Sequence, residues 1–173
     1  MPFIQTFTGR NFYPLAPSVS DVDIRDIAHA LANKCRYNGH CQQFYSVAQH
    51  SVLVCRYCEN KKWGLLHDSE EAYLPDIPSP IKVLPEFAPL REAAVRIRKV
   101  VCSRFDLDPV EPEEVRLVDK RMMITEIRDL MISGSCWDKY YRLYETYDVE
   151  ITPWPPRMAR EIFLSAANSL GII

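Results

Sequence analysis

Two adjacent residues of the kind that bind metals, His67 and Asp68, follow the apolar residues Trp63, Leu65 and Leu66. The apolar residues before the pair predict that it lies on a partly buried helix. Imidazole nitrogens and carboxylate oxygens both suit divalent transition metals. A lone His-Asp pair is weak evidence, because many proteins carry one by chance on a solvated helix. The hypothesis of a metal site therefore depends on whether other possible ligand residues are expected near this pair.

Two further carboxylates follow the pair closely. Glu71 lies four residues after His67, so a continuous helix would place its carboxylate on the same side as the pair. Pro75 and Pro78 are expected to end this helix, because proline lacks the backbone N–H and clashes with the preceding turn. Asp76 is then expected in a rigid turn just beyond the helix end.

A second histidine, His50, lies in the first turns of another predicted helix. That helix begins at Ser46, because the residues from Ser46 to Gln49 fit the S-x-x-Q capping pattern. The apolar flanks of His50 make it either a buried core histidine or a ligand. The connection 59–62 is short, so the two helices are expected to be antiparallel neighbours. This topology can bring His50 near His67.

A third carboxylate, Asp119, falls within the apolar face of a long helix predicted to begin after Pro112. A carboxylate on such a face is costly unless it is paired, hydrogen-bonded or bound to a metal. Arg116 lies one turn earlier on that side, so an ion pair with Asp119 is the alternative to a ligand role. The buried face of this helix is marked by Val115, Val118, Met122 and Leu130.

Helical periodicity accounts for most of the remaining chain. Apolar residues recur at helical spacing over 24–34, 88–105 and about 157–169. Residues 1–20 lack a clear period and are expected to form an extended arm or short strands. The aromatic-rich segment 135–150 is interpreted as a packing or subunit surface. About six helices with little strand signal indicate an all-α fold, a compact helical bundle.

Length and composition favour a single domain over residues 1–173. The composition is that of a soluble globular protein, with 47% hydrophobic and 25% charged residues. The net charge of −2 argues against a nucleic-acid-binding surface. No apolar run is long enough for a membrane span, and the N-terminus does not resemble a signal peptide, so a cytoplasmic protein is expected. Cys55 and Cys58 form a lone CxxC, which we interpret as ordinary helix residues.

Together, His50, the pair His67-Asp68 and Asp119 give two histidines and two carboxylates in the order H…HD…D. In this pattern the chain resembles the HD-domain metal-dependent phosphohydrolases. It is most similar to the branch with bacterial 5′-deoxynucleotidases and phage deoxynucleoside triphosphohydrolases. The resemblance covers a core of about 24–131, leaving 135–173 as a C-terminal helical extension. It is carried by YSVAQHS, by LLHDSEEAYLPDIPSPIK and by the later aspartate.

The resemblance implies a role for each candidate residue. A divalent metal, Co²⁺, Mn²⁺ or Zn²⁺ with Mg²⁺ as a further candidate, is expected to bind His50, His67, Asp68 and Asp119. Catalytic roles are implied for Glu71 and Asp76. Nucleoside binding is implied for Arg36 and Tyr37, and phosphate binding for Lys82 and Arg116. The resemblance also implies an all-α HD-domain bundle that forms a homo-oligomer.

The expected activity is hydrolysis of phosphoester bonds in a nucleotide, with metal-activated water attacking phosphorus. The substrate is expected to be a deoxynucleoside monophosphate or triphosphate, and dATP is a serious candidate. One alternative is a nucleotide-binding sensor in which the metal is structural and there is no turnover. Another is an interaction protein whose functional surface is the aromatic segment 135–147.

Overall fold

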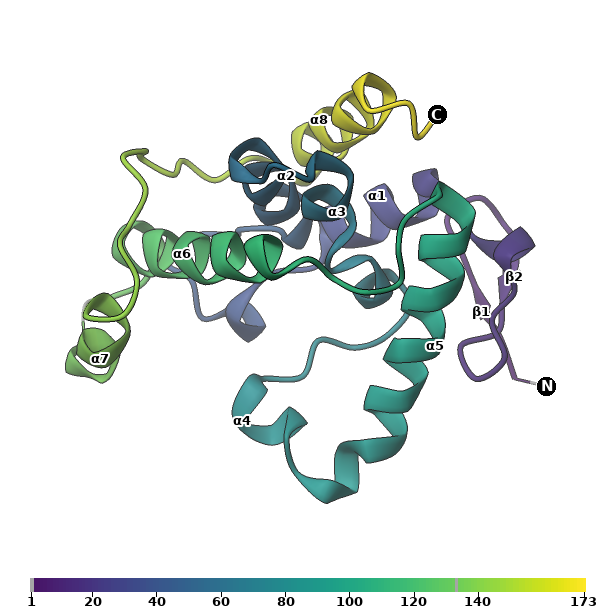
Figure 1. Ribbon diagram of the computed structural model, residues 1–173, viewed down its shortest axis with the longest axis horizontal. Helices are drawn as coiled ribbons and strands as arrows, with labels where there is room; N and C mark the ends of the chain where they lie inside the picture. The colour runs from purple at the N-terminus through teal and green to yellow at the C-terminus, as the bar shows by residue number, and fades with distance from the viewer. Residues whose placement is uncertain (1, 133) are drawn as a thin grey trace.

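Helices make up most of the computed structural model, which describes residues 2–132 and 134–173 (Figure 1). Within these residues, eight α-helices are found: α1 (Ile24–Asn33), α2 (Val47–Tyr57), α3 (Lys61–Leu66), α4 (Ser79–Lys82), α5 (Ala88–Phe105), α6 (Glu113–Leu130), α7 (Asp138–Tyr141) and α8 (Pro156–Ser169). Two short strands, β1 (Ile4–Gln5) and β2 (Asn11–Phe12), pair antiparallel. The prediction of an all-α fold is confirmed. Six helices are longer than one turn, and α4 and α7 are single turns.

Helix α2 is the centre of the packing, since it contacts α1, α3, α6 and α8. It begins as predicted, because the Ser46 side chain accepts a hydrogen bond from Gln49 N at 3.1 Å. The Gln49 side chain does not complete a reciprocal cap. It instead donates to Thr152 O at 2.8 Å and accepts from Trp154 N at 2.7 Å. These two bonds attach the segment before α8 to the central helix.

Two apolar clusters lie on opposite sides of α2. One joins α1, α5 and α8 to α2 and α3, and its fully buried members include Ile27, Leu31, Leu65, Ile97 and Phe163. The other joins α6 to α2 and α3, and its fully buried members include Tyr45, Val54, Trp63, Val115 and Met122. Burial of each large apolar side chain contributes about 1.5–3 kcal/mol. Cys55 is buried in the first cluster, and Cys58, the C-cap of α2, is buried in the second.

The continuous helix predicted from His67 through Glu71 was wrong. Helix α3 ends at Leu66 with His67 as its C-cap, and a 3₁₀ helix, η3 (Ser69–Ala72), follows Asp68. The tighter turn is visible in the hydrogen bond from Glu71 N to Asp68 O, at 3.0 Å. Glu71 therefore does not lie one α-helical turn above His67.

A contact from α5 accounts for the position of η3. The Glu70 side chain is buried and is hydrogen-bonded to Arg98 of α5. Arg98 is therefore not simply a solvated residue of α5, since it pairs with a buried carboxylate. Figure 1 shows α4 and the first turns of α5 extending away from α2, α3 and α6. In the described part of the chain, no helix combines the length and apolar character needed to cross a membrane.

Candidate metal centre

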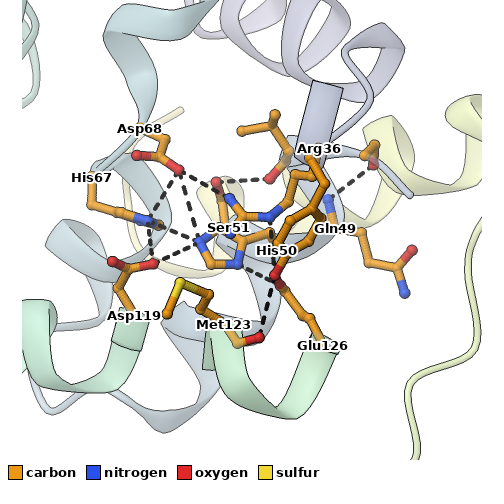
Figure 2. Close-up of polar contacts among 12 residues, drawn as sticks. Arg36, Gln49, His50, Ser51, His67, Asp68, Asp119, Met123 and Glu126 are labelled. Carbon is orange, nitrogen blue, oxygen red and sulfur yellow. Dashed lines mark hydrogen bonds and ion pairs between the residues drawn. The ribbon is translucent and has the colours of Figure 1, made fainter. Parts of the chain in front are cut away.

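The structure brings His50, His67 and Asp119 together from α2, the end of α3 and α6, and we call them the His-His-Asp cluster (Figure 2). The Nε2 atoms of the two histidines lie 3.1 Å apart. Asp119 Oδ1 lies 3.3 Å from His50 Nε2 and 4.0 Å from His67 Nε2. Both histidines are buried, and Asp119 is partly buried. The structure therefore brings His50 and Asp119 close to His67, and the three side chains could hold a metal ion.

Hydrogen bonds on the far side of each ring hold the two histidines in place. His67 Nδ1 lies 2.9 Å from Gly64 O, which can only accept, so Nδ1 carries the proton. His50 Nδ1 lies 2.6 Å from Glu126 Oε1. When both rings are neutral, each Nε2 is therefore an unprotonated nitrogen that faces the cluster. A carboxylate or carbonyl behind each ring is the usual arrangement for metal-binding histidines.

Glu126 is ionised in this arrangement. Burial by itself raises the pKa of this carboxyl group, but Arg36 and His50 lower it to about 2. The carboxylate is fully buried and accepts hydrogen bonds from Arg36 Nε at 3.1 Å, Tyr37 Oη at 2.7 Å and Tyr45 Oη at 2.8 Å, besides His50. Its negative charge makes it a strong acceptor for the His50 Nδ1 proton.

The cluster needs a positive charge at its centre. Two imidazole lone pairs and a carboxylate that converge without a cation would repel one another. Burial by itself lowers the pKa of His67, but Asp68 and Asp119 raise it to about 10, so a proton can supply this charge. A metal ion can supply it equally well. Ligand atoms about 2.0–2.2 Å from one ion lie about 2.8–3.6 Å apart in adjacent positions. The 3.1 Å and 3.3 Å separations fall in this range, whereas the 4.0 Å between His67 Nε2 and Asp119 Oδ1 is longer.

Asp68 lies beside the cluster. Its Oδ2 is 3.3 Å from His67 Nε2 and 3.8 Å from His50 Nε2, and Arg36 Nη1 is 3.6 Å away on another side. Burial opposes ionisation of Asp68, but His67, His50 and Arg36 hold its pKa well below the usual range. An ionised carboxylate is thus within reach of both histidines, although Asp68 is not among the three residues whose ligand atoms all lie close together.

Glu126 was not predicted from the sequence. The available signal is its position seven residues after Asp119, which places both carboxylates on the same face of α6, two turns apart. Arg36 and Tyr37, which we expected to bind a nucleoside, both donate hydrogen bonds to Glu126. The ring of Tyr37 remains half-buried, and its backbone adopts a left-handed φ of 54°. Such a conformation costs about 1–2 kcal/mol, and the hydroxyl contact with Glu126 helps to hold it.

Glu71 lies within η3 and Asp76 on the segment that follows it, and both are half-buried. Burial together with the charges of Asp68 and Asp76 raises the pKa of Glu71 to about 8. Glu71 is therefore mainly protonated at neutral pH. The side chain of Lys34, which was also not predicted, donates to the backbone carbonyls of Glu71 and Leu74.

Two predicted substrate residues do not join the cluster. Arg116 is exposed and makes no ion pair with Asp119, so the alternative interpretation of Asp119 as its structural partner was wrong. Arg116 is exposed to solvent, and Asp119 faces His50 and His67. Lys82 ends α4, on the part of the chain that extends away from α6 in Figure 1. Among the described residues, its carbonyl accepts from Arg91 and its ammonium has no recorded ion pair.

No protein-family model matches the chain. The uncharacterized protein YfdR of Escherichia coli (strain K12) is 38% identical to it over 175 residues, which cover 99% of this chain and 97% of YfdR. The uncharacterized protein RCAP_rcc00048 of Rhodobacter capsulatus is 34% identical over 124 residues, which cover 63% of this chain and 61% of that protein. Because the first alignment spans nearly all of both sequences, the chain belongs to the same protein family as YfdR.

Proposed function

We propose that this protein is a metal-dependent phosphohydrolase that acts on nucleotides. The observation that carries the proposal is the convergence of His50 Nε2, His67 Nε2 and Asp119 Oδ1. Both rings are held from behind by acceptors, at 2.6 Å and 2.9 Å. This donor set suits Mn²⁺, Co²⁺ or Zn²⁺. Asp68 completes it as a fourth ligand, because its Oδ2 is within 4 Å of both Nε2 atoms.

A bound divalent metal supplies Lewis acidity, which polarises a phosphoryl oxygen and lowers the pKa of water toward about 7. The chain contributes the proton chemistry. Asp76 orients the attacking water, and Glu71 carries a proton to the oxygen that leaves phosphorus. In the protein without metal, burial and the charges of Asp68 and Asp76 raise the pKa of Glu71 to about 8, so that Glu71 carries a proton at neutral pH. Attack of water on phosphorus breaks the P–O bond without a covalent intermediate.

The substrate class follows from the segment next to the cluster. Arg36 is a permanent cation 3.6 Å from Asp68, and the half-buried ring of Tyr37 follows it. A cation and an aromatic surface beside a metal suit a molecule with a phosphate and a base. The resemblance to the HD-domain branch narrows this class to deoxynucleoside mono- or triphosphates, with dATP as a leading candidate.

The test is a screen of ribo- and deoxynucleotides, each as mono- and triphosphate, with phosphate release and chromatography as readouts. The protein is stripped with EDTA and reloaded with Mn²⁺, Co²⁺, Zn²⁺ or Mg²⁺. We expect turnover that depends on the metal, favours a deoxynucleotide and is absent from His67→Ala. Metal binding without turnover of any nucleotide would favour the sensor interpretation. Equal cleavage of p-nitrophenyl phosphate and every nucleotide would contradict a nucleotide pocket.

A further inference from the structure

The segment 71–78, which we call the acidic turn, carries both candidate catalytic carboxylates, Glu71 and Asp76. It contains Pro75 and Pro78, which have no backbone N–H to donate. Residues 75–78 adopt no regular structure. In the described chain, two hydrogen bonds reach the backbone of the acidic turn from a distant element, and Lys34 Nζ donates both.

The acceptors are the carbonyl of Glu71 and the carbonyl of Leu74, the latter at 2.5 Å. Both lie where η3 ends, so neither belongs to a continuing helix. Carbonyls at a helix end lack partners and carry partial negative charge, which a cation stabilises. Burial lowers the pKa of Lys34, and the negative charges of Asp76 and Asp68 oppose this by favouring the ammonium form. Lys34 therefore offsets both the carbonyl dipoles and the charge of the acidic turn.

The backbone of Lys34 is itself fixed to the helix that carries His50. Lys34 follows α1 as its C-cap, and its carbonyl accepts from Val47 N at 3.0 Å. The next residue, Cys35, forms a β-bridge with Ser46, the N-cap of α2. The junction formed by residues 34–35 and 46–47 thus fixes both the start of α2 and the backbone of Lys34. The side chain then spans from this junction to the acidic turn.

We propose that Lys34 is the positioning residue that holds Glu71 and Asp76 in place beside the metal centre. The catalytic consequence rests on the proposed function, whereas the attachment of the acidic turn by Lys34 does not. The converging ligand atoms belong to His50, His67 and Asp119, whereas the acceptors of Lys34 Nζ are the carbonyls of Glu71 and Leu74. Loss of the ammonium is therefore expected to release the acidic turn and leave the metal bound.

The first test is hydrogen exchange of the full-length protein loaded with Mn²⁺, followed by mass spectrometry of peptides that cover 71–78. Lys34→Met keeps the length of the side chain and removes its charge and donors. We expect the amides of the acidic turn to exchange at least about tenfold faster in this variant. Lys34→Arg, which keeps a cation with several donors, is expected to restore at least part of the protection. Lys61→Met is the matched control, because Lys61 Nζ also donates to a backbone carbonyl, Arg56 O, at 2.7 Å on an exposed surface.

The second test compares Mn²⁺ affinity and steady-state kinetics of the same variants. Lys34→Met should bind Mn²⁺ within about threefold of the parent and lose about 10- to 100-fold in kcat with little change in KM. If Lys34→Met does not fold, Lys34→Gln takes its place with the same expected outcomes. Unchanged exchange over 71–78 in a folded variant would overturn the proposal, whatever the activity. If the parent hydrolyses no nucleotide, the proposed function fails, and exchange still decides whether Lys34 holds the turn.

Discussion

At the scale of single residues, Glu126 is the group that holds the side chains of the candidate site in place. It is fully buried, and its carboxylate accepts from four side chains on three segments: Arg36, Tyr37, Tyr45 and His50. One carboxylate thus sets the tautomer of a candidate metal ligand and orients the candidate nucleoside residues. A buried group with this many partners cannot be replaced without leaving donors unpaired.

We therefore expect Glu126→Gln to weaken metal binding about 10- to 100-fold, because the neutral amide is a poorer acceptor for His50 Nδ1 and introduces an unwanted donor. Titration of the stripped protein with Mn²⁺ measures this. Glu86→Gln, at an exposed position, serves as the control. Unchanged Mn²⁺ affinity in a folded Glu126→Gln variant would show that Glu126 does not support the centre.

Glu71 supplies a prediction about pH. Its pKa is raised from 4.5 to about 8 in the folded protein, so the folded state favours the protonated form. Stability from this group is complete below about pH 4.5 and is lost as the pH rises toward 8. Glu71→Gln cannot lose a proton. In EDTA, the free energy of unfolding of this variant relative to the parent should therefore increase between about pH 5 and pH 8 and then level off. Urea denaturation at several pH values measures this difference in the free energy of unfolding. A difference that does not change with pH would rule out a raised pKa.

At the scale of elements, the candidate metal centre depends on the close approach of α2 and α3. Gly64 permits it, because a Cβ at this position would lie 2.9 Å from Cys55 Cα and 3.0 Å from Cys58 Sγ. The carbonyl of Gly64 is also the acceptor for His67 Nδ1. The glycine thus links helix packing to the orientation of a ligand.

Gly64→Ala is expected to destabilise the protein by about 1–3 kcal/mol, because the backbone of α2 must shift to admit the methyl group. Gly134→Ala is the control, since a Cβ there would lie 3.6 Å from its nearest neighbour, Cys136 Sγ. Denaturant midpoints of the two variants provide the comparison. Equal midpoints for both variants would mean that the α2–α3 contact tolerates a side chain.

The helices that carry the site could be predicted from sequence because their signals are local. The apolar period of α1, the Ser46 cap of α2 and the proline before α6 all lie within the elements that they define. The break after His67 could not be predicted, because it accompanies a contact between Glu70 and Arg98, which are 28 residues apart. The roles of Glu126 and Lys34 could not be predicted for the same reason, since their partners lie in distant segments.

At the scale of the whole molecule, the candidate metal centre lies where three helical segments meet. His50 lies on α2, His67 at the end of α3 and Asp119 on α6, and Glu126 joins α6 to the loop after α1 (Figure 2). An ion bound here would connect elements that are distant in sequence. Such an ion stabilises the folded state over the unfolded chain by mass action.

The most direct test of the metal centre is elemental analysis combined with thermal unfolding, on the parent and on His67→Ala and Asp119→Ala. After reloading and dialysis, the parent is expected to retain a stoichiometric divalent metal and to unfold at a higher temperature than in EDTA. Both variants should retain little metal and show no such shift, because each lacks one of the three converging ligand atoms. Parent-like metal content and an EDTA-sensitive melting temperature in both variants would contradict the assignment.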